Sequence, residues 1–293
     1  MLGNVLAITC AMVWSLSVVL MKISGARIHP LALNLGKNII GLLLLVLSAI
    51  VVEGQVHIPG TRETALLMLS GLLGIGVADG MILRAMQYLH ASHVAILECL
   101  FAPFVIVLSI LFLNEKPTPV MLLGGALIMA SLIFVSPKGT IQDHVRPEER
   151  RKGILLMSGG LFLVALGIII IKPLFDSVPL FSLVTLRMVA GVLGSGLIFL
   201  FIGDRRARFK EFFTAPHKGI LLWGCFLSAY LSIILWVAGY KYLQASVAAL
   251  LNQTSTIFTV LFAILFLKEK LTRSKVYAIL LAMSGAALIS LAT

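Results

Sequence analysis

The sequence predicts an all-α integral membrane protein, with ten transmembrane helices arranged as two inverted five-helix repeats. Three observations predict this fold. Hydrophobic residues make up 60% of the 293 residues and charged residues only 12%, whereas soluble domains carry about 25%. The charged residues cluster in short gaps between apolar runs of about 20 residues, the length at which a helix crosses the hydrocarbon core. The two halves of the chain also repeat each other's residues.

The apolar runs predict ten spans, at 4–22, 31–52, 64–83, 93–113, 119–136, 153–171, 180–202, 219–240, 246–267 and 275–292. Lipid offers the backbone no hydrogen bonds, so segments of this length must be helices. The first run lacks the basic flank and the cleavage site of a signal peptide, so we expect it to be a retained span. The three cysteines lie inside apolar runs and predict neither disulfides nor a metal site.

The halves are expected to divide within the longest polar stretch, 137–152, giving repeats at 1–145 and 146–293. Residues 88–92 (YLHAS) align with 242–246 (YLQAS), and 110–116 with 264–270, at a constant offset of 154. An offset of 150 aligns Lys37 with Arg187 near the start of each half's second span. Because each half has five spans, the two halves must cross the membrane in opposite directions. Inverted repeats of this kind are typical of transporters that work by alternating access.

A turn closes the fourth span of each half, with the sequence NEKPTP at 114–119 and KEKLTR at 268–273. Together with the five-plus-five spans, these turns resemble the drug/metabolite transporter superfamily, and most closely its ten-helix EamA-like branch. The second turn departs from the family pattern at Arg273, where the family often has proline. The resemblance implies a central cavity between the halves and a substrate among amino acids, other metabolites, drugs or nucleotide sugars.

The basic residues favour one orientation in a cell (inner) membrane. The loops after spans five, seven and nine hold clusters of Lys and Arg, whereas each loop after an even-numbered span holds one. Since basic loops stay in the cytoplasm, this bias places both termini outside, but the EamA-like resemblance implies cytoplasmic termini. The net charge of +11 is explained by these flanking residues, so we expect the lipid bilayer and no nucleic acid as partner.

Charged groups inside spans are costly and mark functional sites. Glu98 lies in the fourth span, and its repeat mate is Asn252. A carboxylate there is expected either to bind a proton or substrate cation in the cavity or to hold a neighbouring helix. Lys37 and Arg187 are expected either to bind an anion, such as a carboxylate, or to extend their charges to the interface.

The third span contains Asp79, five residues from Arg84 and preceded by several glycines. Because neighbours on a helix are three or four residues apart, Asp79 is expected to reach another helix instead. The glycines favour close helix packing.

The most polar stretch inside any span is 252–256 (NQTST). In a continuous helix Asn252, Ser255 and Thr256 share a face, which predicts either a hydrogen-bonding wall for a polar ligand or contacts between helices. Tyr230, Trp236 and Trp14 are second-rank lining residues.

The motifs of hydrolases, metalloproteases and phosphate-binding loops are absent from the sequence. We therefore expect a transporter without cofactor or metal, as a monomer or a dimer. The leading hypothesis is a secondary active exporter of a small polar metabolite such as an amino acid, with a proton as the candidate coupling ion. The alternatives are uptake of a metabolite or nucleotide, efflux of cationic drugs, and a membrane enzyme or lipid-handling protein.

Overall fold

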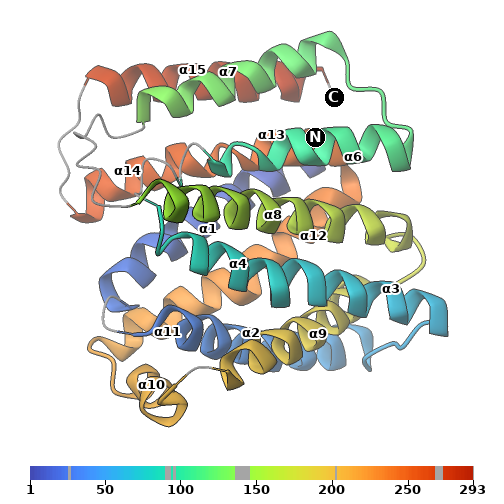
Figure 1. Cartoon of the computed structure of the whole chain (residues 1–293). Helices are drawn as coiled ribbons and strands as arrows, with labels where there is room; N and C mark the ends of the chain where they lie inside the picture. Colours follow the sequence, from blue (N-terminus) through green and yellow to red (C-terminus); the bar gives the residue numbers. More distant parts are fainter. Residues whose placement is uncertain are drawn as a thin grey trace.

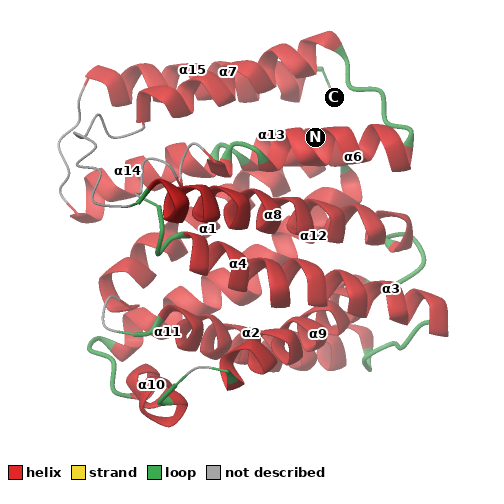
Figure 2. Cartoon of the chain, viewed as in Figure 1, coloured by secondary structure: helices red, strands yellow, loops and turns green. Residues whose placement is uncertain are grey.

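The computed structural model describes residues 1–25, 28–89, 94, 97–135, 146–201, 203–267 and 273–292. Every regular element in these ranges is a helix (Figure 2). The first half contains α1 (Leu2–Gly25), α2 (Pro30–Glu53), the run α3 (Thr61–Gly71), η1 (Leu72–Val77) and α4 (Ala78–Ala85), then α6 (Phe101–Leu113) and α7 (Pro119–Val135).

The second half follows the same order. It contains α8 (Pro147–Ile171), η2 (Lys172–Leu174), α9 (Leu180–Leu200), α10 (Arg205–Phe213), the run α11 (Lys218–Phe226), η3 (Leu227–Leu231) and α12 (Ser232–Tyr242), then α13 (Ala245–Asn252), α14 (Ser255–Leu267) and α15 (Arg273–Leu291). Its described residues thus contain three further helices, η2, α10 and α13. The sequence predicted only a loop where α10 lies.

Seven of the described helical runs are long and apolar enough to cross a membrane. They match the expected spans one, two, three, six, seven, eight and nine. The spans expected at 93–113, 119–136 and 275–292 are matched by shorter apolar helices at Phe101–Leu113, Pro119–Ser131 and Val276–Leu291.

Local sequence sets several helix ends. Prolines occupy the first turn of α2 and α8, where a missing N–H is tolerated and the fixed φ suits the helix. The ring nitrogen Nδ1 of His29 accepts the Leu31 N–H at the start of α2. Gly54 ends α2 with a φ of 81°, a conformation that glycine adopts without steric cost.

Two pairs of equivalent helices, α2 with α9 and α7 with α15, pack against each other and run antiparallel (Figure 1). The end of α2 at Glu53 contacts the start of α9 at Ser182, and Leu35 near the start of α2 faces Gly196 near the end of α9. At the opposite edge of the bundle, Gly124 and Gly285 bring α7 and α15 together backbone to backbone. These two pairs form the outer edges, and the other long helices lie between them.

The first helix of each half packs on the other half. α1 contacts α11, α12 and α14, while α8 contacts α3, α4 and α6. Each half therefore completes the core of the other.

The expected spans three, eight and nine are not continuous α-helices, which corrects the prediction. A π-helical segment interrupts the third (η1) and the eighth (η3) at nearly equivalent repeat positions. The ninth breaks at Gln253 and Thr254, and residues 99–100, their repeat mates, form a turn before α6. At the break the Thr254 hydroxyl donates to the Leu251 carbonyl (2.6 Å), so a side chain competes with the helical hydrogen bonds of the backbone.

Carboxylates cap three helix N-termini. Glu53 accepts the Phe181 and Ser182 N–H groups at 2.8 and 3.0 Å. Glu115 accepts the Ala245 and Ser246 N–H groups at 2.5 and 3.0 Å. Such caps satisfy free amide groups and oppose the positive end of the helix dipole.

The third capping carboxylate is Glu211 of α10, which accepts the His29 N–H at 2.8 Å. This hydrogen bond, assisted by Arg208, lowers the pKa of the Glu211 carboxyl from its ordinary value. Glu115 and its repeat mate Glu269 carried the family resemblance; Glu269 lies outside the described residues.

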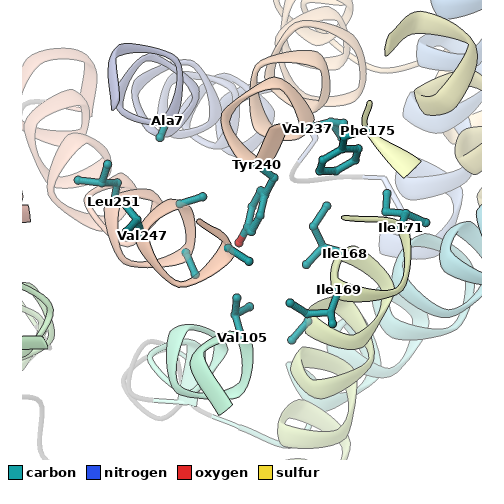
Figure 3. Close-up of a cluster of buried hydrophobic side chains, with 14 of the residues drawn as sticks. Ala7, Val105, Ile168, Ile169, Ile171, Phe175, Val237, Tyr240, Val247 and Leu251 are labelled. Carbon is teal, nitrogen blue, oxygen red and sulfur yellow. The ribbon is translucent and has the colours of Figure 1, made fainter. Parts of the chain in front are cut away.

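The largest buried apolar cluster surrounds Tyr240, whose ring lies among Val105, Ile168 and Val247 (Figure 3). These residues come from α12, α6, α8 and α13, so both halves contribute to this core. The Lys172 ammonium donates to the Tyr240 and Leu243 carbonyls at the end of α12. Lys172 thus satisfies backbone carbonyls that the end of the helix leaves without a partner, as a cation at a helix C-terminus does.

Candidate functional site

Arg187 is the most deeply buried charge in the described part of the chain. It lies two turns into α9, with 2% of its surface exposed. Its Nε donates to the Ser70 hydroxyl (3.0 Å), which itself donates to the Gly167 carbonyl (2.6 Å). The guanidinium carbon lies 5.5 Å from the ring centroid of Trp236, so Trp236 is one of its few electrostatic partners.

No acidic residue of the described ranges forms an ion pair with Arg187. Its Nη1 group is buried and has no hydrogen-bond partner there. An unpaired buried ion costs several kcal/mol, so the site favours an anion. The sequence left open that Arg187 extends its charge to the membrane interface. The burial of its guanidinium contradicts that alternative.

The glycines of the third span make this burial possible. A Cβ built on Gly71 would lie 2.0 Å from the Arg187 carbonyl oxygen, and one on Gly74 would lie 3.7 Å from Nη2. The backbone of α3 and η1 thus lies directly against α9. The expectation that these glycines permit close helix packing is confirmed.

Lys37, the repeat mate of Arg187, has an acidic partner. Its Nζ lies 3.9 Å from Asp79 Oδ2, and both side chains are partly buried, at 16% and 28% exposure. Asn34 of α2 also lies beside the Asp79 carboxylate. Asp79 therefore reaches another helix, as expected, and it neutralises Lys37, whereas no acid of the described ranges neutralises Arg187.

Arg84 points to a different partner. It lies against Tyr88, and this contact, together with Lys152, lowers the pKa of the Tyr88 hydroxyl. The Lys152 ammonium lies 5.4 Å from the centroid of the Tyr88 ring.

The polar stretch 252–256 coincides with the helix break. Asn252 ends α13 and Ser255 begins α14, so the continuous helix assumed for this stretch is wrong. Asn252, Ser255 and Thr256 are all partly exposed, whereas Gln253 and Thr254 are buried, and the shared face stays a prediction. The Gln253 amide donates to the Glu98 carbonyl (3.3 Å), which joins the break to the matching turn of the first half. The Ser255 carbonyl accepts from Ser15 of α1 (2.6 Å), a contact between helices.

Glu98 lies immediately before the turn at 99–100, and its side chain is exposed. Its mate Asn252 is half-buried, with an Nδ2 group that lacks a hydrogen-bond partner among the described residues. The two mates thus flank the paired breaks, one charged and one neutral.

The three aromatic residues expected as second-rank lining residues lie in different surroundings. Trp236 packs edge-to-face on Tyr240, with ring centroids 5.0 Å apart, and so extends the Arg187 environment. Tyr230 shares a hydrogen bond with Ser48 of α2 (2.6 Å). Trp14 is 43% exposed and so lies outside the buried core.

Sequence reasoning missed Ser70, Tyr240 and Gln253. Tyr240 is fully buried, and its hydroxyl approaches the Asn252 amide without forming a hydrogen bond of good geometry. Together with the unpaired groups of Arg187 and Asn252, it forms a set of buried polar atoms on α9, α12 and α13. Buried polar groups are normally satisfied, so this set has free capacity to bind a polar ligand.

The chain was compared with known proteins. The model of the EamA-like transporter family matches residues 1–136 and 151–291. No curated protein matches the chain. One solved structure, titled "Crystal structure of protein", is 15% identical, covers 99% of this chain and 96% of its own, and superposes with a TM-score of 0.80; this likeness concerns the fold alone. The chain is a multi-pass membrane protein and belongs to the EamA-like transporter family, with one match to the family model in each half.

Proposed function

We propose that the protein is a secondary active transporter that exports a small polar metabolite, an amino acid or a relative, by alternating access. Arg187 carries the proposal: it is a buried cation with a free N–H group and no acidic partner in the described part of the chain. A substrate carboxylate is the natural acceptor for a guanidinium. Intramembrane charges of this kind typically lie on substrate pathways.

Glu98 supplies the opposite charge. A carboxylate beside a helix break within an expected span is suited to bind a substrate amine or a proton in alternation. Asn252 and Tyr240 add uncharged hydrogen-bonding groups. One anion site, one carboxylate and neutral polar groups suit a zwitterion better than a lipophilic cation.

We propose that the chain crosses the membrane ten times, as two inverted repeats of five helices at 1–145 and 146–293. The antiparallel packing of α2 with α9 and of α7 with α15 supports this arrangement, since inverted repeats must run in opposite directions. The matched π-helical segments and breaks support it as well. Alternating access then requires the two five-helix repeats to rock against each other about the paired breaks.

We propose that the loops after odd-numbered spans face the cytoplasm. The basic clusters at 146–152 and 205–218 support this orientation, although the family resemblance implies the reverse. A reporter that is active only in the cytoplasm, fused after Thr293, should stay inactive. Activity would place both termini inside and reverse the assignment.

A metabolite panel tests the substrate. Amino acids, monocarboxylates, amines, nucleotides and cationic drugs are added to the purified protein, because a ligand that binds only the folded state raises the unfolding temperature. We expect stabilisation by an amino acid, followed by counterflow of the same compound in proteoliposomes. Stabilisation by nucleotides or cationic drugs alone would contradict the proposed substrate.

The variant Glu98→Gln tests coupling. We expect it to abolish transport or its pH dependence, because a neutral amide neither binds a proton nor pairs with an amine at this position. The matched control is Glu148→Gln, which makes the same chemical change on an exposed residue of the first turn of α8. Unchanged pH-dependent flux in Glu98→Gln would remove this role.

A further inference from the structure

The helix α10 has no counterpart in the first half. The equivalent connection there, residues 54–60, contains no helix. α10 has the sequence RRARFKEFF, with four basic residues and three phenylalanines in nine positions. A short helix of this composition is typical of segments that lie in the membrane interface.

The phenylalanines fix α10 against the bundle. Phe212 is 7% exposed and lies so close to Gly36 of α2 that a Cβ there would be 2.7 Å from its ring. Phe209 packs on Phe199 and Phe213 with centroid distances of 5.9 and 5.4 Å. The position of α10 on the side of the bundle is therefore set by packing.

Two of the four basic side chains of α10 have no hydrogen-bond or ion-pair partner among the described residues. Arg205 donates to the Leu200 carbonyl (3.2 Å), and Arg208 pairs with Glu211 (3.1 Å). Arg206 and Lys210 are exposed and have no partner among the described residues. They stand one turn apart on the side of α10 that also holds Phe213, given the three- and four-residue spacings.

An apolar groove of about 380 Å³ lies between α2, α10 and α11. Its lining includes Ile40, Leu43, Phe212, Phe213 and Leu222, and Lys218 is its charged lining residue. Leu43 and Leu222 are 65% and 53% exposed. The groove thus offers apolar surface to a hydrocarbon chain, with Lys218 in its lining and with Arg206 and Lys210 on the helix that forms one of its walls.

We propose that α10 and this groove bind an anionic phospholipid of the surrounding bilayer. The headgroup phosphate meets Arg206, Lys210 and Lys218, and an acyl chain lies in the groove against Leu43 and Leu222. The charge complementarity selects the anionic headgroup, since each basic residue near an anionic surface contributes attraction. The apolar lining favours a lipid over a free anion. The site is independent of the transported substrate.

Native mass spectrometry of the delipidated full-length protein tests the proposal, with phosphatidylglycerol, phosphatidylcholine and inorganic phosphate as probes. We expect phosphatidylglycerol to bind at least tenfold more tightly than phosphatidylcholine, and more weakly as salt rises. Arg206→Gln/Lys210→Gln should weaken phosphatidylglycerol binding by about thirtyfold. Leu43→Trp, which fills the groove, should weaken the binding of both lipids.

The control is Arg62→Gln/Lys116→Gln, which removes the same charge from two exposed positions, one in the first turn of α3 and one in the connection after α6. It should leave lipid binding within about twofold of wild type, because these residues lie outside the site. Equal binding of the two lipids by the wild type would overturn the proposal whether or not the variants fold. So would competition by inorganic phosphate as effective as that of the lipid, which would indicate a free-anion site.

Discussion

Replacing Arg187 by Met removes the buried charge and keeps an unbranched side chain of similar length. The variant loses the hydrogen bond to Ser70, worth about 1.5–3 kcal/mol for a charged donor, and the contact with Trp236, worth about 2 kcal/mol when desolvated. Ser70 keeps its own hydrogen bond to Gly167. The variant also escapes the penalty of several kcal/mol for an ion buried without a counter-ion.

These terms nearly cancel, so we expect the free energy of unfolding of Arg187→Met to stay within about 2 kcal/mol of the wild-type value. The stabilisation by a carboxylate substrate, about 2.7 kcal/mol at a hundred times its Kd, should vanish. The assay is thermal unfolding of the purified protein with and without substrate, followed by counterflow in proteoliposomes.

Two results would refute the reasoning. A loss of more than about 4 kcal/mol without ligand would make Arg187 a structural residue whose hydrogen bonds outweigh its desolvation. A full ligand shift in Arg187→Met would place the anion site elsewhere. Arg187→Lys serves as the comparison: it keeps the charge but loses the planar fork, so it should bind more weakly than wild type and more tightly than Met.

Three further predictions concern stability. Glu115→Ala should lower the free energy of unfolding by about 2–3 kcal/mol, since it leaves the N-terminus of α13 uncapped, measured by thermal unfolding. Gly71→Ala should cost about 1–3 kcal/mol because its Cβ collides with the backbone of α9, whereas Gly219→Ala, which meets nothing within 4 Å, should be neutral or stabilising. The pKa of Glu211 is lower in the folded protein than in the unfolded chain. Its carboxylate therefore contributes fully to the free energy of unfolding above the unfolded pKa of about 4.3, and this contribution is lost as the pH falls through the lower folded pKa. Glu211→Gln should flatten the dependence of stability on pH in that acid range, measured as the midpoint of thermal unfolding against pH.

Each of these has a contradicting result. An unchanged midpoint for Glu115→Ala would mean that water replaces the cap. Equal effects at Gly71 and Gly219 would mean that α3 and α9 do not approach closely. An acid profile that is identical in wild type and Glu211→Gln would assign the acid sensitivity to other carboxyls.

The helical class and the two related halves could be predicted from the sequence because they depend on composition, run length and residue matches. The interruptions could not. The polar residues at 252–256 indicate a site, but periodicity alone does not distinguish an exposed face from a helix break. Their mates at 98–100 include Cys99 and Leu100, which carry no such signal at all.

The difference between Lys37 and Arg187 also lay beyond the sequence. The repeat pairs them as equivalent cations, yet Asp79 neutralises Lys37 and no described acid neutralises Arg187. That outcome depends on which helices pack together, and so on contacts between residues far apart in the chain. Tyr240 is a similar case, since one buried tyrosine looks like any other aromatic residue in an apolar run.

The packing of each half's first helix on the other half has a consequence for synthesis. The Cys10 thiol and the Ser15 hydroxyl on α1 find their partners at Ser232 and Ser255, more than 200 residues later in translation. The first helix to enter the membrane therefore cannot form these contacts until α12 and α14 have been synthesised. Until then its packing face is exposed to lipid or to the insertion machinery. Such distant contacts slow folding, so release of a truncated chain before α12 and α14 are made should leave α1 without its native neighbours.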